Sequence, residues 1–66
     1  MTISNFTVPE LNNFRENCNF VGDELLVFEL RSQGSSLKEI ANILETTEDS
    51  IKKISRKVNK KIIKVI

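Results

Sequence analysis

Six basic side chains close to the C-terminus recur at a spacing that aligns them on one side of a helix. They are Lys52, Lys53, Arg56, Lys57, Lys60 and Lys64. Residues three and four apart are neighbours on a helix surface, so this spacing builds a row of cations. Ammonium and guanidinium groups bind phosphate oxygens, and the pattern therefore indicates a polyanionic partner, first of all the phosphate backbone of DNA.

The net charge of +1 conceals a strong separation of charge along the chain. Residues 1–49 carry three basic and nine acidic side chains, whereas residues 50–66 carry seven basic and no acidic ones. Such an asymmetry creates a one-sided electrostatic field. A purely structural alternative is that the lysines solubilise a helix and favour its negative C-terminal end. That alternative accounts for Lys60 and Lys64, but not for Lys52 and Lys53, which come early in the segment.

The helix that must carry these cations is predicted from Glu48 to Lys64. Thr47 is a favourable N-cap, and the acidic Glu48 and Asp49 occupy the first turn, where the helix dipole favours negative charge. An apolar stripe at helical spacing runs along the other side. Its members are Ile51, Ile54, Val58, Ile62 and Val65.

A shorter helix is predicted just before it, from Leu37 to Glu45. Ser36 and Glu39 form an S-x-x-E capping box, in which each side chain satisfies a free backbone N–H group of the other residue. The apolar face of this helix consists of Leu37, Ile40, Ala41 and Leu44.

Two further helices are predicted upstream. A T-x-x-E capping box at 7–10, with a proline in the first turn, begins a helix that runs from Val8 to Asn17. Asp23 and Glu24 begin the next helix, and Gly34 ends it because glycine readily enters the left-handed conformation. This second helix is apolar on more than one face, as expected of a buried strut. We expect the centre of the core to be formed by Leu26, Val27, Leu30, Ile40, Leu44, Ile51 and Val58.

These elements predict an all-α protein, a small four-helix domain over residues 8–66 that contains a helix-turn-helix. Residues 1–7 are a tail, and Ile3 and Phe6 make it either a frayed end or a strap over the core.

The composition argues against an enzyme or a membrane protein. There is no histidine, no glycine-rich phosphate loop and no metal-binding cluster, so we expect no catalytic residue, metal or cofactor. The single Cys18 is interpreted as a small buried apolar residue. No apolar run approaches the roughly 20 residues that cross a bilayer, and the N-terminus does not resemble a secretory signal. A cytoplasmic location is the simplest expectation.

Three stretches of the chain together carry a family resemblance: FVGDELLVFEL at 20–30, QGSSLKEIA at 33–41 and LETTEDSIK at 44–52. They resemble the helix-turn-helix domain of LuxR/FixJ/GerE-type bacterial regulators, whose pattern is shared in large part by sigma-factor region 4. The family pattern reads L-T-P-x-E-x-x-V-L-x-L, then G-x-S-x-K-E-I-A-x-x-L-x-I-S-x-x-T-V-K. This chain departs from it at Val21 and Gly22, which replace Thr-Pro, and at Asp49, where a basic or small residue is common.

The resemblance implies a recognition helix at about 48–64 in the major groove, with the preceding helix crossing the DNA backbone. Lys52, Lys53 and Arg56 match the family's DNA-facing positions, and Arg56 is the candidate for reading guanine. Lys57 and Lys60 resemble phosphate contacts. Hydroxyl and backbone N–H groups at helix N-termini also bind phosphate, which adds a further set of candidates. That set is Ser36, Lys38, Thr47 and Ser50, with capping alone as the alternative for Ser36 and Thr47.

We therefore expect a sequence-specific transcriptional regulator that binds double-stranded DNA. The alternative is a helix-turn-helix that serves as a protein-interaction module for RNA polymerase or another regulator, because residues 1–49 are acidic. A basic amphipathic helix lying on a membrane would explain residues 50–66 but not the capped helices before them.

A weak homodimer, paired on DNA, is also expected, since one such domain contacts only a few base pairs. The expected contact is the end of the last helix, at Ile62, Ile63 and Ile66. Lysines at 60, 61 and 64 would repel each other across a two-fold axis unless DNA neutralised them.

Overall fold

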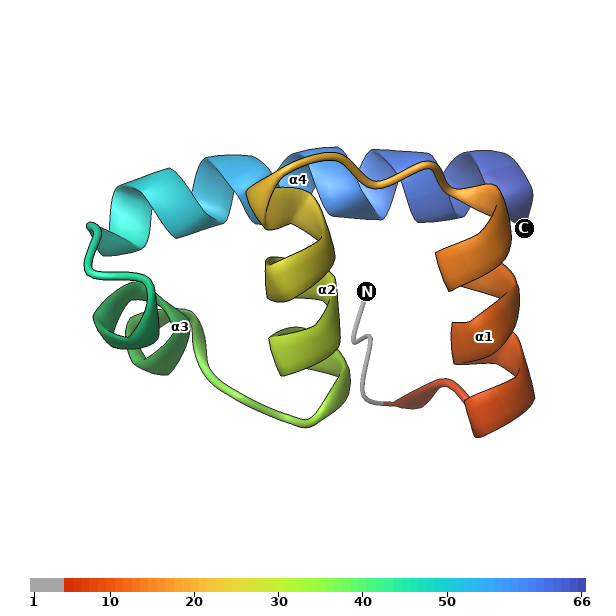
Figure 1. The fold of residues 1–66 in the computed structure, drawn as a ribbon, viewed down its shortest axis with the longest axis horizontal. Helices are drawn as coiled ribbons and strands as arrows, with labels where there is room; N and C mark the ends of the chain where they lie inside the picture. Colours follow the sequence, from red (N-terminus) through yellow and green to blue (C-terminus); the bar gives the residue numbers. More distant parts are fainter. Residues whose placement is uncertain (1–4) are drawn as a thin grey trace.

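The computed structural model describes residues 5–66, which form four helices and no strand. The helices are α1 (Val8–Asn17), α2 (Asp23–Ser32), α3 (Leu37–Ile43) and α4 (Glu48–Val65). The other three helices all contact α4, and α2 also contacts α3. In Figure 1, α1 and α2 lie side by side across α4, and α3 lies under its N-terminal end. The predicted all-α class and the number of helices are confirmed.

Local capping explains where the helices begin. The Ser36 Oγ accepts the backbone N–H of Glu39 at 3.1 Å, and the Glu39 carboxylate accepts the Ser36 N–H at 3.2 Å. Thr7 and Glu10 form the second reciprocal box, also as predicted. At α4, the Thr47 Oγ1 accepts the backbone N–H of Ser50 at 3.2 Å. Each cap satisfies donors that a helix start would otherwise leave unpaired.

Two helices end in the same hydrogen-bonded turn. After α2, Gly34 has a φ of 92°, and the N–H groups of Gly34 and Ser35 bond back to Arg31 and Leu30. After α3, Glu45 takes the equivalent left-handed position with a φ of 54°. The predicted end of α3 at Glu45 is therefore wrong by two residues, because Glu45 belongs to the terminating turn and the helix stops at Ile43.

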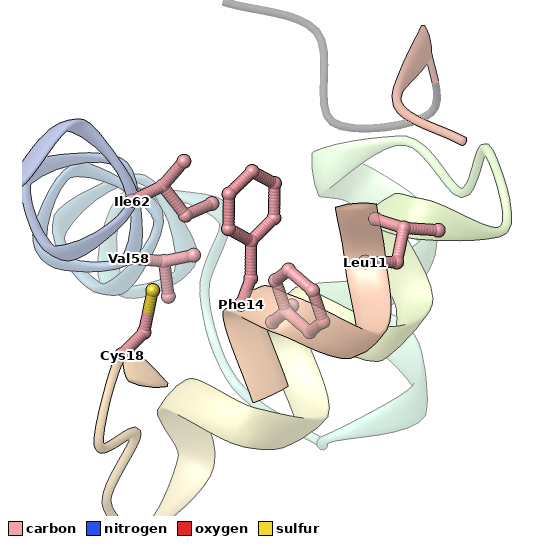
Figure 2. Close-up of a cluster of buried hydrophobic side chains, with 6 residues drawn as sticks. Leu11, Phe14, Cys18, Val58 and Ile62 are labelled. Carbon is pink, nitrogen blue, oxygen red and sulfur yellow. The ribbon is translucent and has the colours of Figure 1, made fainter. Parts of the chain in front are cut away.

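The core consists of two clusters placed end to end along α4. The first joins Val27, Ile40, Ala41 and Ile51, with half-buried apolar residues around them. The second joins α1 and α2 to the C-terminal half of α4 and contains Leu11, Phe14, Cys18, Phe28, Val58 and Ile62. Figure 2 shows Val58 and Ile62 projecting from α4 toward Cys18 and Phe14. Ile54 packs against both clusters and so links them.

Some predicted core positions are wrong. Leu26 is 49% exposed, because α2 turns its neighbours Val27 and Phe28 inward, toward the helices that pack on it. Leu30 and Leu44 are only half-buried and lie at the edge of the first cluster.

On α4, the buried side is rotated relative to the predicted stripe. Ser55 is buried among the apolar residues, while Ile54 lies at the margin.

The short segment before α1 is packed against the core. Phe6 meets the ring of Phe14 edge-on at a centroid distance of 4.9 Å, so this part of the tail is a strap, one of the two alternatives. Ile3, the other apolar residue of the predicted tail, lies outside the described residues. Cys18 is buried as predicted, and burial raises the pKa of its thiol.

Two adjacent isoleucines test the assignment of the α4 faces. Ile62 is fully buried, whereas Ile63 is 63% exposed. We expect Ile62→Ala to lower the free energy of unfolding by about 2–5 kcal/mol, because it removes packed atoms and leaves a cavity. The matched Ile63→Ala change should cost about 0.5 kcal/mol or less. Chemical denaturation of both variants measures this, and equal losses would contradict the assigned faces.

Candidate nucleic-acid interface

The six predicted cations all lie on the exposed side of α4. Lys52, Lys53, Arg56, Lys57, Lys60 and Lys64 are each exposed. The two ion pairs found within residues 5–66 involve none of them. The row therefore presents its charges to solvent, ready to contact an anion.

The core holds this row in place from behind. The buried residues of α4 are Ile51, Ser55, Val58 and Ile62, which recur every three or four residues and anchor one side of the helix. At about 100° per residue, the six cations fill the half of the helix turned away from these anchors. The backbone that carries the cations is thus fixed by packing, and only their long side chains need to be ordered by a ligand.

Lys61 interrupts the row and has a different role. Its ammonium group forms an ion pair with the Glu24 carboxylate at the start of α2 and donates a hydrogen bond to the Asn19 carbonyl oxygen at 3.0 Å. The Lys61 hydrogen bond, aided by the Val21 N–H, lowers the pKa of Glu24 below its ordinary value. In the sequence, nothing distinguishes Lys61 from the neighbouring lysines. In the folded protein, Lys61 connects α4 to the α1–α2 loop.

The candidates at the helix starts are engaged in capping. The hydroxyl oxygens of Ser36 and Thr47 accept backbone N–H groups, and the Thr47 hydroxyl also donates to the Ser50 Oγ at 3.0 Å. Thr47 and Ser50 are thus brought together at the start of α4. Lys38 is exposed on the separate helix α3. Capping is therefore the observed role of Ser36 and Thr47.

The beginning of α4 is acidic. Glu48 and Asp49 are both exposed in the first turn. At about 100° per residue, Asp49 lies on the same side as Lys53 and Arg56, whereas Glu48 lies toward the edge of that face. Phosphate contacts are thus favoured from Lys52 onward and opposed in the first turn.

The expected dimer contact needs a correction. Ile62 is fully buried against α1 and α2, so it cannot contact a second copy unless the core opens. Ile63 and Ile66 are 63% and 75% exposed and remain candidates.

No family model, curated protein or solved structure matches the chain. Within residues 5–66, no helix is long and apolar enough to cross a membrane. The same residues contain no cluster of three or more potential metal-ligating side chains.

The Glu24–Lys61 pair predicts how stability depends on pH. Because the pKa of Glu24 is lowered in the folded protein, the stabilisation from the pair is present above the ordinary glutamate pKa. It is lost as the pH falls through the lowered value. We expect Glu24→Gln to cost about 1 kcal/mol or less at neutral pH and to reduce the loss of stability on acidification.

Urea unfolding at a series of pH values measures this effect. Glu16→Gln is the matched control, since Glu16 is exposed on α1 and neither ion pair within residues 5–66 involves it. Parallel pH profiles for wild type and Glu24→Gln would show that the pair does not contribute.

Proposed function

We propose that this protein is a small DNA-binding transcriptional regulator in which α3 and α4 act as a helix-turn-helix and α4 enters the major groove. The observation that carries the proposal is the row of six exposed cations on a helix anchored from behind by the core. The sequence resemblance to LuxR/FixJ/GerE-type domains supports the same interpretation. Both arguments select the same helix.

The proposed roles follow from position along the row. Lys52, Lys53 and Arg56 would face the base edges, where the planar guanidinium of Arg56 can donate two hydrogen bonds to guanine. Lys57 and Lys60 would contact phosphates on one side of the groove. α3 would support this placement, because Ile40 packs with Ile51 and fixes the two helices against each other. Lys38 would add a phosphate contact at the start of α3.

Substitutions at two neighbouring lysines distinguish a loss of phosphate binding from a loss of protein stability. Lys60 is exposed and outside both ion pairs of residues 5–66, whereas Lys61 pairs with Glu24. We expect Lys60→Ala to weaken binding to every duplex and to reduce the slope of log K against log salt by about 0.9. Lys61→Ala should leave that slope unchanged while lowering the thermal midpoint. Fluorescence anisotropy with a random-sequence duplex at several salt concentrations provides the measurement.

Substitution of Arg56 tests whether α4 distinguishes one DNA sequence from another. Selection from random DNA would first identify a favoured site. Arg56→Ala should then cost about 1–3 kcal/mol on that site and less on random DNA, because a lost base contact reduces discrimination. An equal loss on both duplexes would make α4 an electrostatic anchor that does not read sequence. If the wild type failed to bind DNA at low salt, the proposal would fail, and RNA polymerase or another regulator would become the candidate partner.

A further inference from the structure

Two exposed apolar patches lie outside the core, and one of them borders the cationic row. The first, the α2 patch, consists of Val21, Leu25 and Leu26, which are 57%, 44% and 49% exposed. The second, the α4 patch, consists of Ile63 and Ile66. Leu25 follows Val21 by four residues and Ile66 follows Ile63 by three. Ile63 and Ile66 therefore lie next to each other along α4, whereas Leu25 and Leu26 are consecutive residues near the start of α2 and Val21 precedes its first turn.

Each patch lies beside an exposed charge, and the two charges have opposite sign. The α2 patch lies beside Asp23, which is exposed in the first turn of its helix. The α4 patch lies beside Lys60, which precedes Ile63 by three residues, is exposed and is outside both ion pairs of residues 5–66. Apolar patches with complementary charged neighbours fit each other, whereas two copies of the α4 patch would bring lysines together.

The patches also lie on opposite edges of α4. Val21 donates its N–H to the Glu24 carboxylate, and Glu24 pairs with Lys61, so the Val21 end of the α2 patch lies at the Lys61 edge. Ile63 follows Lys61 by two residues, which places it about 160° around the helix. One molecule therefore cannot bring its own two patches together, but neighbouring molecules can.

We propose that this chain associates with further copies of itself head to tail, the α2 patch of one molecule docking on the α4 patch of the next. In a head-to-tail assembly, one α2 patch and one α4 patch remain free at the two ends. The assembly therefore grows larger as the protein concentration rises, unless it closes into a ring. Most of the cationic side of α4 lies between the Lys61 edge and the Ile63 edge, so the head-to-tail contact leaves it exposed. The assembly is a property of the protein alone and does not rest on the proposed DNA binding.

Sedimentation velocity without DNA, over a range of protein concentrations, tests the assembly. The wild type should form dimers and then larger species as concentration rises. Leu25→Glu and Ile63→Glu should each raise the apparent dissociation constant by about tenfold or more, because each places a charge in the apolar contact. Val8→Glu is the matched control, since Val8 is 69% exposed at the other end of α1 from the loop, and it should assemble like the wild type.

Mixing the two defective variants gives the decisive result. Leu25→Glu retains an intact α4 patch and Ile63→Glu retains an intact α2 patch, so the mixture should form a one-to-one pair that does not grow further. Recovery of pairing would also show that both variants are folded. A wild type that stays monomeric would overturn the proposal. So would variants that remain monomeric when mixed. A Leu25→Glu variant that still dimerises by itself would also overturn it, since a two-fold contact through Ile63 predicts that outcome.

Discussion

Burial of one side of α4 is the constraint on which the rest of the structure depends. Ile51, Val58 and Ile62 are fully removed from water only when α1, α2 and α3 all pack on that helix. Neither core cluster would persist without α4, because each draws on one half of it. The half-buried Ile54 joins the two clusters, so the 18-residue helix acts as the spine of the domain.

The same burial determines which cations are exposed. Once Ser55 and Val58 face inward, the opposite half of the helix must face solvent, and that half carries the cationic row. Lys61 falls at the boundary between the two halves, where the Glu24 carboxylate is within reach. A lysine there stabilises the approach of the α1–α2 loop, whereas a lysine in the middle of the row remains available to an anion.

The connection between α3 and α4 determines how the candidate interface is presented. The left-handed Glu45 ends α3, and the Thr47 cap begins α4 two residues later, so little freedom remains in the turn. Packing of Ile40 against Ile51 then holds the two helices together. The acidic first turn of α4 lies next to the basic row. Under the proposed function, the basic row would attract the DNA phosphates and the acidic turn would repel them.

Local signals in the sequence were sufficient for the helix starts, the all-α class and the position of the cationic row. Capping boxes and helical spacing act over a few residues, so Ser36, Thr7 and the six cations could be interpreted without knowledge of the fold. Only tertiary structure decided that Leu26 is exposed, that Ser55 is buried and that Lys61 is paired. The physical reason is that the exact rotation of a helix depends on which neighbours pack against it, and those neighbours are distant in sequence.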